Sequence, residues 1–264
     1  MTGDGVLDGH IQRLFDWFLE TEPFFATHMG RHEYDDRVPD ASRDRQLRDI
    51  ETAKGFRADI ADVEPTTLSP GKRVDQNLML HTLDLNLYEQ EGLRFWESYP
   101  QGASGMGSGL FSLFMRDFAP LPQRMASITA RLEKYPAMLE QHKTRITRPV
   151  KLWCEIGLES AQRFPGFLAI IGQTGADALE KGPRERLQDA IERTLAATNG
   201  YADWIHDDAL PKAVDRVGIG EATFRELLKH RHLPLALEEI YDLGWKYLKD
   251  SKEELARIAG QIKP

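Results

Sequence analysis

Residues 70–88 read PGKRVDQNLMLHTLDLNLY, and this stretch decides the fold class. Its apolar side chains recur at steps of three and four residues, which is the period of an α-helix. They form two stripes, one of Val74, Leu78, His81, Leu85 and Tyr88 and the other of Leu80, Leu83 and Leu87. Because a helix that is apolar on two sides packs on two sides, we expect this helix to be central.

Ser69 followed by Pro70 is typical of a helix start, with Ser as the cap and Pro in the first turn. The same helical period governs the chain before this point. We expect one helix that ends near Pro23 and Gly30, then a charged loop, then a helix over residues 40–62.

The chain after residue 110 has the same helical period. We expect prolines 120, 122 and 136 to punctuate two helices, Pro149 to open another, and residues 183–210 to form a long one. No segment alternates with the period of a strand. The sequence therefore predicts an all-α fold of many, mostly antiparallel helices in a single domain over residues 1–264.

Composition excludes several classes of protein. The 264 residues contain 34 Lys and Arg against 42 Asp and Glu, a net charge of −8, with no basic block for nucleic acid. No apolar run is long enough to cross a membrane, and residues 1–8 do not resemble a signal peptide. The single cysteine, Cys154, suits a reducing compartment. We therefore expect a cytoplasmic protein that binds neither nucleic acid nor membrane.

Few motifs point to chemistry. The glycine-rich segment 102–109 fits no phosphate or dinucleotide fingerprint, so it is interpreted as a flexible surface loop. Ser69 and Lys72 have the spacing of an acylating pair but lack its partner motifs, which leaves Ser69 as a cap. Cys154 is expected to be an inert, buried thiol, and His81 a core histidine.

A metal role for the histidines is the weakest alternative. His28 and His32 have an i,i+4 spacing, but Gly30 interrupts any shared helix and no third ligand is evident. Asp203 and His206 resemble half of a di-iron motif whose other half is missing. We therefore expect no metal and no complete catalytic constellation in this chain.

Five groups of residues, in order along the chain, resemble the N-terminal half of a bacterial family, the domain of unknown function 885 family. They are Gly30–Asp36 with Pro39–Asp40; Phe118–Pro120 with Arg124 and Arg131–Leu132; Tyr135–Leu139; Arg148–Pro149 with Trp153 and Glu155; and Glu238–Ile240 with Leu243–Gly244. Members of this family are similar to gluzincin zinc peptidases of the carboxypeptidase Taq and angiotensin-converting-enzyme kind. The resemblance implies that the helices form one wall of a peptide-binding channel.

The zinc helix of such peptidases, His-Glu-x-x-His, is absent, since His32-Glu33 is followed by Tyr-Asp-Asp-Arg. The resemblance therefore implies a non-catalytic N-terminal half of a hydrolase, with zinc only in a C-terminal half that would be its partner. The chain then looks like a truncated, split or cloned piece that alone binds no zinc and cleaves no peptide. The alternative is a stand-alone helical module that binds a partner peptide or helix.

The charged segment Gly30–Asp36 supplies the candidate substrate-binding residues. It gathers His32, Glu33, Tyr34 and Asp35 in a stretch predicted to be non-helical. Because binding residues concentrate on loops held by rigid scaffolds, we expect these four side chains to line the channel. An ordinary solvated connection between helices is the competing interpretation. No catalytic residue is assigned.

Overall fold

The computed structural model describes residues 2–262 and confirms the all-α prediction. The described residues contain ten α-helices and no strand, with one isolated bridge between Val150 and Val214. The helices are α1 (Gly3–Thr21), α2 (Pro23–His28), α3 (Arg43–Ala61), α4 (Pro70–Tyr88), α5 (Gly102–Met115), α6 (Leu121–Lys143), α7 (Lys151–Ala178), α8 (Lys181–Trp204), α9 (Glu221–His230) and α10 (Leu237–Ile262).

The chain divides into two compact units after Gly218. The first unit contains α1 to α8, and the second contains α9 and α10. The interpretation of residues 1–264 as one domain stays a prediction.

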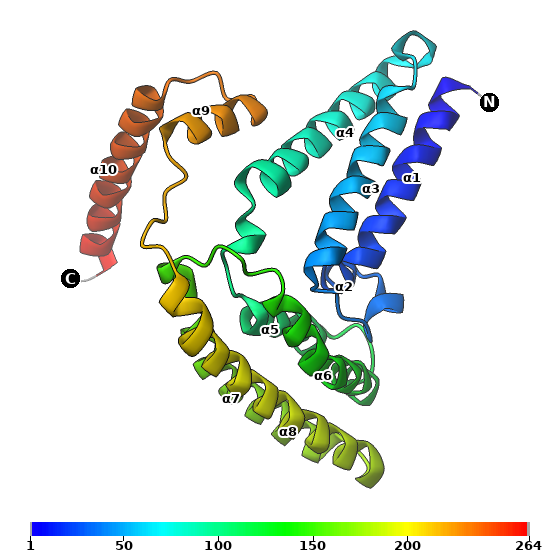
Figure 1. The fold of residues 1–264 in the computed structure, drawn as a ribbon, viewed down its shortest axis with the longest axis vertical. Helices are drawn as coiled ribbons and strands as arrows, with labels where there is room; N and C mark the ends of the chain where they lie inside the picture. The colour runs from blue at the N-terminus through cyan, green and yellow to red at the C-terminus, as the bar shows by residue number, and fades with distance from the viewer. Residues whose placement is uncertain (1, 263–264) are drawn as a thin grey trace. The chain divides into compact units, whose positions relative to one another are not determined.

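Helices α1, α3 and α4 lie side by side and share the smaller hydrophobic cluster of the first unit (Figure 1). At the start of α3, the Ser42 hydroxyl accepts a hydrogen bond from the Arg45 N–H at 3.2 Å. Helix α4 begins at Pro70, directly after Ser69, as predicted. The buried members of this cluster are Leu7, Ala53, Ile60, Val63, Leu68 and Leu83.

The prediction that α4 is central is wrong. Val74 and Leu78 keep 65% and 55% of their surface exposed, and only Gln76 and Leu83 of this helix are buried. The Gln76 amide donates to the carbonyl oxygens of Ile60 and Val63 at the end of α3. Gln76 and Leu83 therefore mark the face of α4 that is packed, and Val74 and Leu78 lie on a different face that is exposed to solvent.

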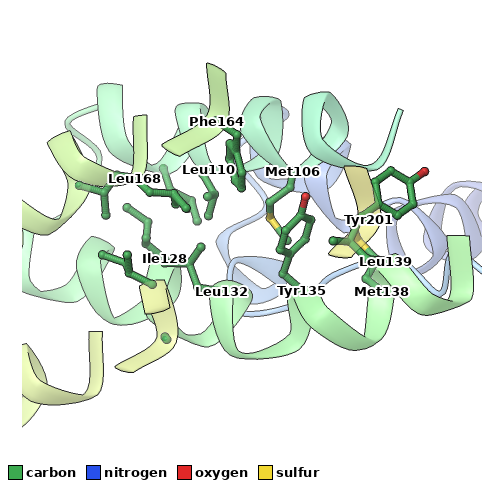
Figure 2. Packing of buried hydrophobic residues seen from close by; sticks show 14 of the residues in the cluster. Met106, Leu110, Ile128, Leu132, Tyr135, Met138, Leu139, Phe164, Leu168 and Tyr201 are labelled. Atoms are coloured by element: carbon green, nitrogen blue, oxygen red, sulfur yellow. The ribbon is translucent and has the colours of Figure 1, made fainter. Parts of the chain in front are cut away.

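Helices α5 to α8 enclose the larger cluster (Figure 2). Its buried residues come from all four helices and include Met106, Leu110, Ile128, Leu132, Tyr135, Met138, Leu139, Phe164, Leu168 and Tyr201. Pro136 lies inside α6 and does not divide it, contrary to the prediction of two helices. A proline has no N–H for the carbonyl four residues earlier, here Leu132. The Thr194 hydroxyl of α8 donates to that carbonyl at 3.2 Å.

The glycine-rich segment is not a flexible loop, because it forms the first half of α5. A Cβ at Gly109 would lie 2.7 Å from the Phe24 ring, and one at Gly102 would lie 2.5 Å from a Leu139 methyl. These two glycines therefore allow α5 to approach α2 and α6 closely. Tertiary packing outweighs the low helix propensity of the segment.

The second unit consists of two amphipathic helices. Leu227 and Leu228 of α9 are buried, whereas no residue of α10 is. The apolar residues of α10 recur at steps of three and four, so they share one face of the helix. Its exposed members include Tyr241, Leu248, Leu255, Ile258 and Ile262.

Candidate functional site

A cavity of about 770 Å³ lies inside the first unit. Its wall draws on both hydrophobic clusters: Ala53 and Leu83 belong to the smaller one, and Ala41 and Met138 to the larger one. The cavity therefore marks the place where these two separately packed groups of helices meet. Cavities of this size are typical of small-molecule and peptide sites.

One side of the cavity is apolar and mostly aromatic. Helix α1 contributes Ile11, Phe15 and Phe18 at steps of three and four residues, which places them on one helix face. Phe24 of α2 continues this surface. Phe15 and Phe18 each keep 37% of their surface exposed, so the wall remains available to a ligand.

The cavity lining also contains charged residues, among them Arg145, which connects the two helix groups. Arg145 donates to the backbone oxygens of Asp40 at 3.0 Å and Ser42 at 3.3 Å. Asp49 accepts a hydrogen bond from Arg45 at 2.7 Å. Burial lowers the pKa of Arg145, although nearby carboxylates, first among them Glu22, oppose this shift.

Glu22 lies at the joint between α1 and α2, where its backbone N–H bonds to the carbonyl oxygen of Phe18. Within the described part of the chain, its carboxylate makes no hydrogen bond or ion pair that meets the usual distance limits, and it does not cap α2. Glu22 is an exposed residue that lines the cavity. Nearby protein atoms replace part of the water around the carboxylate and raise the pKa of Glu22, while the charge of Arg145 opposes this shift and that of Asp49 adds to it.

His142 is another titratable residue that lines the cavity. Its Nδ1 lies 2.8 Å from the Tyr201 hydroxyl, and both side chains are buried. Burial lowers the pKa of His142 to about 3, and the charge of Arg145 adds to this effect. The imidazole is therefore neutral at pH 7 and forms a fixed hydrogen-bonded pair with Tyr201.

The comparisons with known proteins give a family. The sequence matches the model of a bacterial protein family of unknown function, DUF885, over residues 23–264. The chain belongs to the DUF885 family. No curated protein matches this DUF885 chain.

Among solved structures, this DUF885 chain resembles one described as a "putative lipoprotein of unknown function" from Shewanella oneidensis. The TM-score is 0.78 at 18% sequence identity, and the match covers 98% of this chain and 47% of the other. The chain therefore spans about half the length of that solved protein. At this identity the likeness shows the fold alone.

The four residues predicted to bind substrate lie outside the cavity lining of this DUF885 protein. Two of them come together, since His32 Nδ1 lies 2.9 Å from an Asp35 oxygen. The His32 ring also stacks on Phe118, with centroids 3.7 Å apart. The other two face different partners: Glu33 pairs with Arg31, and the Tyr34 ring lies 4.8 Å from the Arg37 guanidinium carbon.

The buried half of this segment is held by Arg131, which has no exposed surface. Asp35 accepts a hydrogen bond from the Thr27 hydroxyl at 2.7 Å, and Arg131 donates to the same hydroxyl and to the carbonyl oxygens of Arg37 and Gly109. Burial lowers the pKa of Arg131 to about 10, against the charge of Asp35. These contacts tie Asp35 to the scaffold, and substrate binding by the segment stays a prediction.

No group of three His, Cys, Asp or Glu side chains within residues 2–262 is arranged to hold a metal. His28 lies on α2, where its Nδ1 is 3.1 Å from Arg116, and His32 lies on the short turn that follows. Cys154 is buried, as predicted, and burial raises the pKa of its thiol to about 11. No described helix is long and apolar enough to span a membrane.

No sequence pattern points to the cavity residues Glu22, His142 and Arg145. They lie between α1 and α2, on α6 and on the turn after α6, and no motif spacing connects them. The helical spacing of Ile11, Phe15 and Phe18 with Glu22 was visible, but a single charged residue at the end of an apolar stripe is common on any helix.

Proposed function

We propose that this DUF885 chain is the ligand-binding, non-catalytic half of a hydrolase that resembles zinc peptidases, and that its cavity receives part of a peptide. The observation that carries the proposal is the cavity itself. It joins an aromatic wall to a small set of polar groups, the combination that orients a ligand with mixed chemistry. The helices around it would then form one wall of a substrate channel.

The chemistry is assigned to a partner half because the residues of this chain do not fit a catalytic zinc. Such a zinc needs three protein ligands and an open fourth position. The described residues bring no three suitable side chains together. The role of this chain is to bind and orient the peptide.

Peptide binding to the purified chain tests the proposal. A library of short peptides should bind, as measured by calorimetry, and Gly105→Leu should weaken binding because Gly105 lines the cavity and a Cβ there meets nothing within 4 Å. Gly71→Leu is the matched control, at an equally open helical position outside the lining. Absence of binding, equal effects of the two variants, or chelator-sensitive cleavage by this chain alone would each contradict the proposal.

Helix α10 is the proposed docking surface for the catalytic half. The solved relative has more chain outside the matched part than inside it, and Leu248 and Leu255 keep 43% and 69% of their surface exposed. A segment equivalent to that unmatched half would bury them. The competing stand-alone module would use the same face for a partner helix, and a second copy would use it for a dimer.

The reading frame after codon 264 discriminates between these occupants. If it continues, the double substitution Leu248→Lys and Leu255→Lys should lower the melting temperature of the longer product and leave that of residues 1–264 unchanged. If it stops, or if light scattering shows that residues 1–264 dimerise through this face, docking of a catalytic half is wrong. The cytoplasmic location, proposed from the lone buried thiol Cys154, is tested by cell fractionation.

A further inference from the structure

Glu22 differs from the other carboxylates that line the cavity. Asp49 receives a hydrogen bond from Arg45 at 2.7 Å, and Asp40 receives one from the Ser42 N–H at 2.9 Å. Arg145, the neighbouring cation, directs its Nε and Nη2 to backbone oxygens of Ser42 and Asp40. In the described structure the Glu22 carboxylate therefore faces the cavity with no donor of its own.

The Glu22 carboxylate lines the cavity without a protein donor, so a ligand that brings a donor can form a charge-assisted hydrogen bond there. The charges nearby favour a cationic donor. The lining contains three carboxylates, Glu22, Asp40 and Asp49, and one guanidinium group, Arg145. Arg45 and Arg48 pair with Asp49 and Asp40, which leaves Glu22 without such a partner. His142 adds no charge at pH 7 because burial keeps it neutral.

The surface beside Glu22 is apolar. Phe15 and Phe18 share one face of α1, and Glu22 follows directly after the end of this helix and lines the same cavity. Phe24, two residues further on, lines the same cavity. A group bound at Glu22 would therefore have aromatic rings directly beside it.

We propose that the cavity binds a primary ammonium group at Glu22, with an adjoining large apolar group held against Phe15 and Phe18. Two kinds of ligand combine these groups. One is a peptide with a free amino terminus and an apolar first residue, and the other is a simple aryl-alkyl amine. The inference rests on the proposed function where the ligand is a peptide. In that case the inference identifies the amino terminus as the end of the peptide that enters the cavity.

Calorimetry with the whole chain tests this with four probes: the peptide Phe-Ala-Ala-Ala, its N-acetylated form, phenethylamine and 2-phenylethanol. The free-amine member of each pair should bind at least about tenfold more tightly than its neutral counterpart. Glu22→Gln should remove this difference, while Glu20→Gln, an exposed position on α1 outside the cavity lining, should preserve it.

The outcomes separate the two proposals. If the acetylated peptide binds as tightly as the free peptide, or if Glu22→Gln keeps the difference, the ammonium site is wrong and peptide binding stands. If phenethylamine binds in a Glu22-dependent way and neither peptide binds, the ammonium site stands and the proposed peptide function is wrong. If no probe binds, both are wrong. Circular dichroism of both variants checks that they fold.

Discussion

Thr194 supplies the hydrogen bond that lets α6 continue through Pro136. The carbonyl oxygen of Leu132 has no intrahelical donor because residue 136 lacks an N–H, and the Thr194 hydroxyl takes that place at 3.2 Å. Leu132 and Thr194 have no exposed surface, so water does not replace the bond. One hydroxyl on α8 thus compensates for a proline on its neighbour.

Thr194→Val should destabilise the chain by about 1–3 kcal/mol, because it leaves a buried acceptor unpaired. Thr129→Val is the control, since the buried Thr129 hydroxyl donates to the Met125 carbonyl of its own helix, which already has a backbone donor. Urea unfolding measures both. A loss for Thr194→Val no greater than that for the control would contradict the role assigned to Thr194.

His142 makes stability depend on pH. Its pKa is about 3 in the folded chain and about 6.5 when unfolded, so below pH 6.5 the unfolded chain binds a proton that the folded chain does not. The contribution of His142 is therefore complete above pH 6.5. It falls by about 1.4 kcal/mol per pH unit as the pH decreases toward 3.

His142→Gln should flatten this dependence, by about 2 kcal/mol between pH 7 and pH 5. The exposed His206 pairs only with Asp207, so His206→Gln is the matched control. Denaturant titrations at a series of pH values measure the slopes. Equal acid sensitivity of the wild type and His142→Gln would show that other groups cause the effect.

At the scale of the element, α5 contains glycines with opposite roles. A Cβ at Gly109 would lie 2.7 Å from Phe24, a ring that also lies 4.8 Å from the Arg131 guanidinium carbon, whereas a Cβ at Gly105 meets nothing within 4 Å. Gly109→Ala should cost about 1–3 kcal/mol through overpacking. Gly105→Ala should stabilise α5 by about 0.5–1 kcal/mol. Thermal melts compare the two, and a shift in the same direction would contradict this division.

The sequence predicts the positions of single helices better than it predicts how the helices pack against one another. The helical period and the start at Ser69–Pro70 follow from local chemistry, and the structure confirms them. The helix predicted over residues 40–62 is observed over Arg43–Ala61. The helical state of segment 102–109 and the exposure of Val74 depend on residues distant in the chain, so local patterns mislead there. The cavity residues escaped prediction for the same reason, since they meet only after α1 and α6 have packed.

Helix α10 should exchange its amide hydrogens much faster than α6 in the isolated chain. None of its residues is buried, whereas α6 has ten buried residues, and helices without burial are marginal in water. Hydrogen–deuterium exchange with mass spectrometry measures the difference. Comparable protection of the two helices would show that a second copy or another partner already covers α10.

At the scale of the whole first unit, Glu97 connects the two helix groups that border the cavity. Its buried carboxylate bonds to Arg43 at 2.7 Å, to Arg148 at 2.8 Å and to Arg94. Burial alone would raise the pKa of Glu97, but the hydrogen bonds from Arg43 and Arg94 outweigh it and the pKa lies below the usual range. Glu97 thus joins the two groups through buried ion pairs, in addition to the contacts of Arg145.

That connection has a consequence for the order of folding. Arg43 and Arg148 lie 54 and 51 residues from Glu97 along the chain, so this cluster closes only after both helix groups have met. Interactions that form after the transition state slow unfolding and leave the folding rate nearly unchanged. Glu97→Gln should therefore cost up to about 3–5 kcal/mol, almost all of it as faster unfolding in stopped-flow experiments. The Glu97 carboxylate would therefore give the first unit kinetic stability, because it slows unfolding once the unit has formed.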